Sequence, residues 1–241
     1  MMRFEKVLAT VLLSLLAVES QALEIVGLVE PHLVVKIGSP AAGIVDSIEV
    51  ERGGRVEKGQ TVARLKSRIE MADVNLANEK HVYLSGQYNR LHSLGVDSFA
   101  SKQVVEQAQT EMRVAKLEAE RQEILLSYRR VESPINGVVV KKILSPGEYV
   151  YEQTPLMVVA QIDPLNIEVL VPVAYFRKLY KGMAAWITLE VGADKPQLAK
   201  VIVIDKVMDP ASSTVGVRLE LPNHKLEIPA GQKCKVTFKE F

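Results

Sequence analysis

The sequence is short of cysteine, of histidine and of net charge, and each shortage excludes a class of protein. Cys234 is the only cysteine in 241 residues, so no internal disulfide forms and the fold must be held by packing alone. Lysine and arginine total 30 and aspartate and glutamate total 29, so no broad basic surface is available to collect nucleic acid. Hydrophobic residues make up 48% of the chain, which is enough to bury real cores.

No catalytic, metal-binding or cofactor-binding motif is recognisable in the chain. The histidines are scattered over separate segments, and no pair has the spacing of metal ligands: they are His32, His81, His92 and His224. A nucleophile elbow, a phosphate-binding loop and a convergent pair of carboxylates are also missing. We therefore predict that the protein is not an enzyme and carries neither a metal nor a cofactor.

Long apolar runs are limited to the N-terminal segment. Val7–Val18 is apolar but too short to span a bilayer. It follows the basic residues Arg3 and Lys6 and precedes Ser20-Gln21-Ala22, whose small residues are of the kind that a signal peptidase reads. We therefore predict a cleaved signal peptide over residues 1–22 and a mature protein outside the cytoplasm. An uncleaved N-terminal anchor is the alternative.

The most informative feature that is present is an internal repeat. The segment Ser39–Leu65 returns as Ser133–Val159, displaced by 94 positions and without a gap. Each copy has short alternating strand patterns interrupted by glycine, and we expect these glycines to form turns: Gly43, Gly53, Gly59, Gly137 and Gly147. One copy alone has too few strands to be stable in water. The two copies are therefore predicted to close on each other as one small sandwich.

The stretch between the copies has the periodicity of two α-helices. In Ser67–Leu94 and in Ser101–Tyr128 apolar residues recur at alternating steps of three and four, and neither segment contains proline. This spacing places a narrow apolar stripe on each helix, as a coiled-coil seam requires. The short link after Gly95 predicts an antiparallel hairpin, roughly 40 Å long at ~1.5 Å per residue.

The chain after Asp163-Pro164 changes to short alternating strands separated by turn residues. The strand candidates are Ala185–Val191, Ala199–Val207, Thr214–Leu221 and Cys234–Phe238. Their even spacing predicts a small β-barrel. The alternating segment Leu23–Ile37 precedes the first repeat copy, and we expect it to add an edge strand to that barrel.

This layout resembles the periplasmic adaptor subunits, or membrane fusion proteins, of tripartite efflux pumps, the family of the HlyD-like and AcrA-like adaptors. The likeness rests on Ser39-Pro40-Ala41-Ala42-Gly43, Ser133-Pro134-Ile135-Asn136-Gly137, Asp209–Val215 and Pro229-Ala230-Gly231-Gln232. The resemblance implies an elongated α+β protein of several modules. These are a β-barrel from residues 23–37 and 162–241, a split lipoyl-like (barrel-sandwich hybrid) domain from 38–66 and 129–161, and a coiled-coil α-helical hairpin over 67–128.

The resemblance also implies a binding site at the tip of the hairpin. Adaptors of this family carry there an arginine, a leucine four positions later and a serine seven positions after that, and Arg90, Leu94 and Ser101 fit this spacing. In the family these residues engage the helical end of a TolC-like outer-membrane channel. The implied partners are that channel, an inner-membrane transporter of the resistance-nodulation-division (RND) type, and further copies of the chain in a ring, six by the family pattern.

Two other functions stay open beside this one. One is an adaptor for an ATP-driven exporter, which uses the same modules, and the other is a lipoyl or biotinyl carrier, which the hairpin between the halves disfavours. Many family members also have a membrane-proximal domain built from both chain ends, whereas this chain stops at Phe241. Docking on the transporter is therefore expected to use the barrel. The predicted location is the periplasm, with attachment to the inner membrane through partners or through an uncleaved N-terminal segment.

Overall fold

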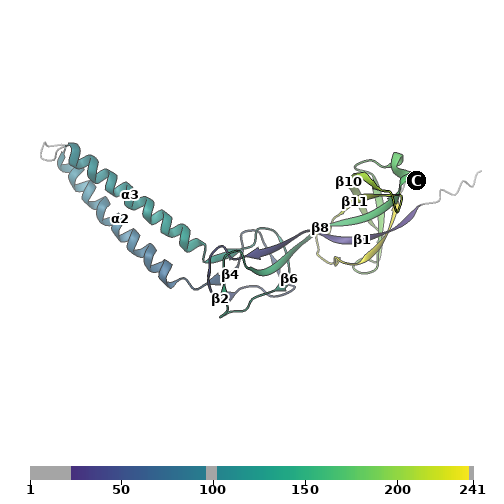
Figure 1. The fold of residues 1–241 in the computed structure, drawn as a ribbon, viewed down its shortest axis with the longest axis horizontal. Coiled ribbons are helices and arrows are strands. Elements are labelled where there is room, and N and C mark those ends of the chain that lie inside the picture. Colours follow the sequence, from purple (N-terminus) through teal and green to yellow (C-terminus); the bar gives the residue numbers. More distant parts are fainter. Residues whose placement is uncertain (1–22, 96–101, 239–241) are drawn as a thin grey trace, which may run out of the picture. The chain divides into compact units, whose positions relative to one another are not determined.

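The computed structural model describes residues 23–95 and 102–238 of the chain. These residues divide into two compact units (Figure 1). One unit is Val34–Ala160, and the other combines the chain up to Leu33 with the chain from Gln161 onward. Strands β1 (Glu24–Gly38) and β8 (Pro155–Pro172) each contribute residues to both units. The last residues of β1, which the sequence analysis assigned to the barrel, thus belong to the first of these units.

The unit Val34–Ala160 contains both repeat copies, and its sheets mix the strands of the two. Its shorter strands are β2 (Gly43–Ile48), β3 (Arg55–Val56), β4 (Thr61–Leu65), β5 (Arg130–Glu132), β6 (Gly137–Lys142) and β7 (Tyr149–Val150). One sheet has the order β5-β4-β2-β7, and a second ladder joins β3 to β6 and β6 to β8. Neither copy forms a sheet by itself, because β7 pairs with β2 and β3 pairs with β6.

The hydrogen bonds between the copies follow the repeat in both directions. The Val45 N–H donates to the Glu148 carbonyl at 2.9 Å, and its counterpart, the Val139 N–H, donates to the Gly54 carbonyl at 2.9 Å. Val45 and Val139 are both fully buried in the shared core. The backbone amides of each copy are therefore satisfied by the other copy, so neither half can bury its strands alone.

The two Ser-Pro steps of the repeat also serve the same purpose. Ser39 and Ser133 are both buried, although serine is usually exposed. The Ser39 hydroxyl donates to the Ala41 carbonyl at 2.5 Å, and the Ser133 hydroxyl donates to the Ile135 carbonyl at 2.7 Å. Each serine thus closes a local turn that leads the chain into the following glycine and strand.

Three of the five repeat glycines lie in turns with a left-handed backbone. The φ angles are +83° at Gly53, +84° at Gly59 and +92° at Gly147. A side chain at these positions would meet the carbonyl oxygen of its own backbone, whereas glycine adopts the conformation freely. These glycines therefore allow the tight turns that connect the short strands.

Gly43 and Gly137 do not form turns, which corrects the expectation from the sequence. They begin strands β2 and β6 and have no positive φ. A Cβ on Gly137 would lie 2.5 Å from the carbonyl oxygen of Ala160, and one on Gly43 would lie 2.7 Å from a guanidinium nitrogen of Arg129. Close packing of neighbouring chain segments, and not backbone conformation, is the physical reason for glycine at both strand entries.

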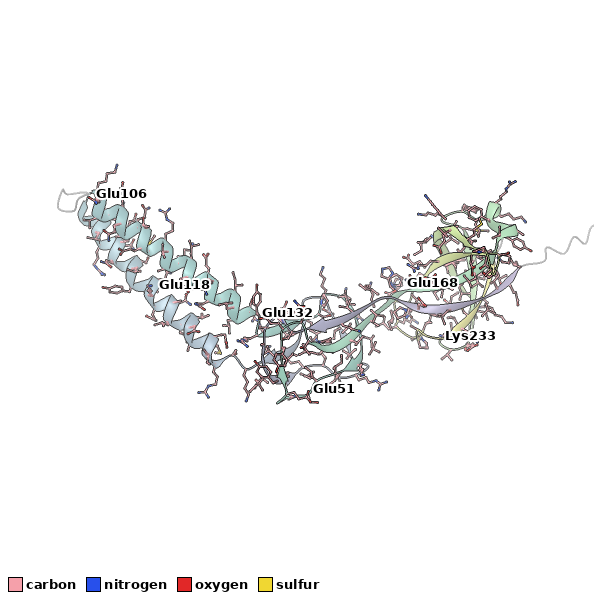
Figure 2. The ribbon with its side chains drawn as sticks, in the orientation of Figure 1. Glu51, Glu106, Glu118, Glu132, Glu168 and Lys233 are labelled. Atoms are coloured by element: carbon pink, nitrogen blue, oxygen red, sulfur yellow. The ribbon has the colours of Figure 1, made fainter. Side chains whose placement is uncertain are left out.

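Helices α2 (Arg68–Gly95) and α3 (Lys102–Ser127) form the hairpin between the repeat copies. The residues at the expected seam positions are buried or half-buried along both helices. On α3 the most buried side chains are alanines, namely Ala108, Ala115 and Ala119. Small seam residues let the two helices approach closely. Long polar side chains cover the remainder of the hairpin, and Glu106 and Glu118 mark the course of α3 in Figure 2.

The second unit is a β-barrel, with β9 (Ala184–Leu189), β10 (Gln197–Asp209), β11 (Thr214–Leu221) and β12 (Lys233–Phe238) as its further strands. The strand order is β1-β12-β9-β10-β11-β8, and β1 pairs with β8 as well. The expectation of an edge strand at residues 23–37 is therefore wrong, because β1 has partners in both β12 and β8. A short 3-10 helix, Val173–Lys178, follows β8. Fully buried side chains such as Met183, Ile187, Leu219 and Phe238 fill the interior.

Candidate functional site

The hairpin tip holds the three residues that the sequence nominates for partner binding. Arg90 lies in the last part of α2 and is exposed to solvent. Leu94 is four positions later in the same helix, about one helical turn further along. Ser101 lies outside the described residues, directly before α3 begins at Lys102. The three positions therefore flank the link between the helices, and the structure does not describe a contact among them.

The end of α2 carries further polar groups around Arg90. The Ser93 hydroxyl donates to the Arg90 carbonyl at 2.8 Å, which satisfies a backbone oxygen near the helix end. The rings of Tyr88 and His92 lie 5.5 Å apart. The Arg90 guanidinium has five N–H donors, and its exposure leaves it accessible to carbonyl or carboxylate groups of a partner.

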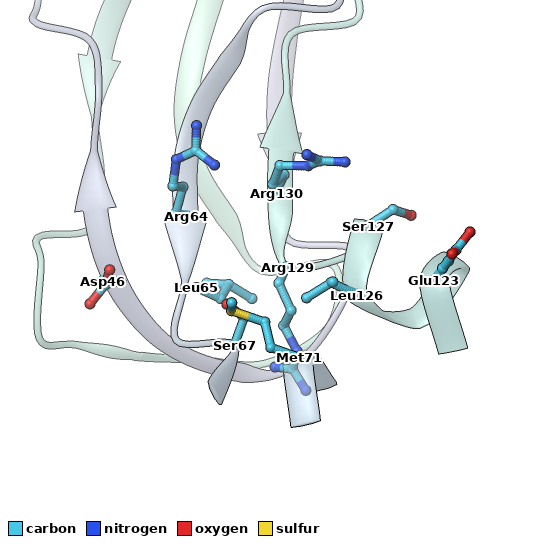
Figure 3. Close-up of a pocket in the computed structure, with 10 residues that line it drawn as sticks. All are labelled: Asp46, Arg64, Leu65, Ser67, Met71, Glu123, Leu126, Ser127, Arg129 and Arg130. Carbon is cyan, nitrogen blue, oxygen red and sulfur yellow. The ribbon is translucent and has the colours of Figure 1, made fainter. Parts of the chain in front are cut away.

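The base of the hairpin holds a second cluster, which the sequence analysis did not identify (Figure 3). Arg129 follows α3 and points toward the start of α2. Its guanidinium donates to the Ala42 carbonyl at 2.6 Å and to Glu70 of α2 at 2.5 Å. One side chain therefore ties the end of α3 to the start of α2 and to the entry of β2. Because both charged side chains are about one-fifth exposed, the ion pair is partly shielded from water.

A cleft of about 450 Å³ opens beside this clamp and has lining residues of both signs of charge. Arg64 and Arg130 lie directly opposite each other on the paired strands β4 and β5, and Asp46 and Glu123 supply negative charge nearby. Arg64 is engaged by Glu49, and the central cation, Arg129, is engaged by Glu70 and Ala42. The cluster is therefore a structural junction between the strands and the hairpin, and its charges are used within the chain.

Outside these two places, the described residues show little of what a catalytic centre needs. Among residues 23–95 and 102–238, no cluster of three histidine, cysteine, aspartate or glutamate side chains has the arrangement of a metal site. At the turn after β10, the Ala211 N–H and the Ser212 hydroxyl donate to the Asp209 carboxylate and hold its pKa below the usual value. Burial raises the pKa of the Cys234 thiol to about 11, so this thiol is neutral at ordinary pH.

Comparison with known proteins gives the following matches. Residues 33–161 match the family described as CzcB-like, barrel-sandwich hybrid domain. The chain is 22% identical over 222 residues to the solvent efflux pump periplasmic linker SrpA of Pseudomonas putida, which covers 86% of this chain and 58% of that protein. It is 25% identical over 228 residues to the multidrug resistance protein MdtE of Escherichia coli K12, which covers 83% and 59%. The chain thus spans less than two thirds of the length of these relatives.

Solved structures share the fold of the chain. A chimeric MacA–MexA protein that contains the α-hairpin domain of Pseudomonas aeruginosa MexA superposes with a TM-score of 0.76 at 21% identity, covering 91% of this chain and 81% of that one. A putative efflux transporter from Bacteroides eggerthii superposes with a TM-score of 0.72 at 17% identity, covering 89% and 68%. At these identities the likeness establishes the fold alone. Within residues 23–95 and 102–238, no helix is long and apolar enough to cross a membrane.

Proposed function

Because the chain belongs to the family of CzcB-like barrel-sandwich hybrid domains, we propose that it is the periplasmic adaptor of an export pump, joining an inner-membrane transporter to an outer-membrane channel. The observation that supports this most is the hairpin between two interlocked β-rich halves. Such a hairpin presents a surface for a partner at a distance from the body that anchors it, and it contributes no reactive group. The proposed role is therefore mechanical and not enzymatic.

The finer identity of the partners is part of the same proposal. The relatives are named as efflux pump linkers and multidrug resistance proteins, which favours a transporter of the RND type and a TolC-like channel. The barrel is proposed to contact the transporter, and several copies of the chain are proposed to surround the conduit as a ring of six. These copies work in the periplasm, held at the inner membrane by the transporter.

The hairpin tip is the proposed contact with the channel. Arg90 would pair with carbonyl or carboxylate groups at the helical end of the channel, while Leu94 would enter a groove between channel helices and Ser101 would cap α3 and donate outward. The exposure of Arg90 and the positions of all three residues beside the interhelical link support this assignment.

The tip assignment is tested by export from cells that depend on this adaptor. Leu94→Asp is expected to abolish export while the protein accumulates normally and keeps its melting temperature, because a tip residue supports little core. Val82→Asp is the matched control, since Val82 is an exposed apolar residue of the same helix away from the tip. Export that is unchanged in Leu94→Asp, or lost equally in Val82→Asp, would reject the assignment.

A further inference from the structure

Helix α2 carries a second apolar row in addition to its seam with α3. Ile69, Leu76 and Tyr83 are spaced by seven residues, so they lie on one side of the helix. Their exposed fractions are 74%, 72% and 66%. Large apolar side chains that face water at every second turn are unusual on a soluble helix, where the outer side is normally polar. The row therefore has the features of a contact surface.

Helix α3 carries a matching row. Val114, Glu118, Arg121, Leu125 and Tyr128 follow one another at steps of four and three, and the three apolar members are exposed. Glu118 and Arg121 form an ion pair at 3.0 Å within this row. Each helix of the hairpin thus has two heptad seams, one of which is occupied by the other helix.

Both rows border the same groove, and therefore lie on the same face of the hairpin. The groove, of about 350 Å³, is lined from α2 by Lys80 and Leu84 and from α3 by Glu111, Val114 and Ala115, with Thr110. Lys80 lies between Leu76 and Tyr83 in the α2 row, at spacings of four and three. The Lys80 charge also acts on Glu118, whose pKa is lowered by the Gln122 side chain and by nearby cations. Val82 is rotated by about 100° from Tyr83 and lies away from this face.

We infer that this face binds the same face of a second copy of the chain, with the two hairpins parallel, so that α2 of each copy packs on α3 of the other. The named residues of the face are Ile69, Leu76, Lys80, Tyr83, Glu111, Val114, Glu118, Leu125 and Tyr128. The product is a four-helix bundle with two-fold symmetry, in which the same surface of both copies is used.

Charge decides the occupant and its orientation. The α2 row carries the cation Lys80, and the α3 row carries the anions Glu111 and Glu118 at the level of the same groove. A parallel two-fold pair places Lys80 of each copy over the glutamates of the other. An antiparallel pair would stack α2 on α2 and α3 on α3, so charges of like sign would meet. The face is therefore complementary to itself in one orientation only.

This inference does not depend on the export role, because it uses only the surface of the hairpin. It goes beyond the proposed ring, since a two-fold contact closes on itself and gives a dimer. A ring built from such copies would have to repeat the dimer through other surfaces.

Cross-linking between two single variants tests the contact directly. Tyr83→Cys and Val114→Cys proteins, each as the full chain and each with a different mass tag, are mixed and mildly oxidised. A disulfide-linked heterodimer is expected, because each Tyr83 position faces Val114 of the other copy. The native Cys234 is buried and its thiol pKa is raised, so it stays unreactive in the folded chain. Val82→Cys mixed with Val114→Cys is the matched control and is expected to give no cross-link.

The oligomeric state supplies the second test. Leu76→Glu combined with Val114→Glu is expected to weaken self-association by about 100-fold, on the order of tenfold per buried side chain, while Val82→Glu leaves it unchanged. Lys80→Glu is expected to weaken the dimer, and adding Glu111→Lys and Glu118→Lys is expected to restore it. A wild-type chain that stays monomeric at its highest soluble concentration in sedimentation experiments, or equal cross-linking at position 82, would overturn the inference.

Discussion

Gln153 occupies in the second repeat copy the position that Gly59 occupies in the first. Both residues have a left-handed backbone, with φ of +64° at Gln153 and +84° at Gly59. Both N–H groups donate to equivalent carbonyls, those of Ser39 and Ser133. The fold therefore imposes the same turn on both copies, although only one of them has the residue that adopts it without cost. A non-glycine residue in this conformation costs about 1–2 kcal/mol.

We expect Gln153→Gly to raise the free energy of unfolding by about 0.5–1 kcal/mol. The substitution removes the left-handed strain, and the greater freedom of glycine in the unfolded chain offsets part of the gain. Urea denaturation measures the change. Glu152→Gly is the control, because this exposed neighbour lacks a positive φ and its replacement only loosens the unfolded chain. Equal destabilisation by both variants would refute the strain at position 153.

The two strand-entry glycines are expected to differ in their tolerance of a methyl group. In Gly137→Ala the new Cβ meets the Ala160 carbonyl, so the backbone must move, and we expect a loss of about 2–3 kcal/mol. In Gly43→Ala the obstacle is the flexible end of Arg129, so the loss is about 1 kcal/mol, near that of one hydrogen bond. Thermal unfolding of the two variants decides the order. Identical melting temperatures would contradict this account.

Among the secondary-structure elements, the hairpin depends on its junction with the strands. A two-helix hairpin with an alanine-rich seam buries little apolar surface, so its base must be fixed by other contacts. The Arg129 guanidinium supplies such contacts to Glu70 and to the Ala42 carbonyl. The first turn of α2 and the last residue before β5 are held together by this side chain.

Removal of this clamp is expected to loosen the hairpin base. We expect Arg129→Gln to lower the free energy of unfolding by about 2 kcal/mol, because two charge-assisted hydrogen bonds are lost. Hydrogen exchange should rise at the first turns of α2 more than in the barrel. A double-mutant cycle with Glu70→Gln should give a coupling of about 1 kcal/mol. Additive effects of the two substitutions would show that the pair is not a unit, and Arg64→Gln serves as the exposed control.

At the scale of the whole molecule, the chain has two separate hydrophobic cores. One core is built from the barrel strands and includes Ile187 and Phe238, and the other joins the repeat copies and includes Val45 and Val139. Strands β1 and β8 continue from one unit into the other. The units therefore share backbone but not packed interiors, which makes a single cooperative unfolding transition unexpected.

We expect a core substitution to destabilise one unit at a time. Ile187→Ala should cost the barrel about 3 kcal/mol and raise hydrogen exchange in β9, β10 and β12, while exchange in β2, β4 and β6 stays as in the wild type. Val139→Ala should give the reverse pattern. Mass-spectrometric hydrogen exchange in low urea measures both. A uniform rise over the whole chain for either variant would mean that the two cores unfold together.

The sequence by itself determined the repeat, the two helices and the strand pattern of the tail. These features depend on local periodicity and on turn residues, which are readable from neighbours in the chain. Residues 214–221, for example, were expected as a strand and form β11. The fold class, a barrel-sandwich hybrid with a helical hairpin and a β-barrel, followed from the order of these elements.

Only the tertiary structure decided which contacts join residues that are far apart in the sequence. It paired β1 with both β12 and β8, explained Gly43 and Gly137 by close approach, and connected Arg129 to Glu70. It also placed Lys80 and Glu118 on one face of the hairpin. The physical reason is that periodicity states which side of an element is apolar, whereas the neighbour that covers that side is chosen by packing of the whole chain.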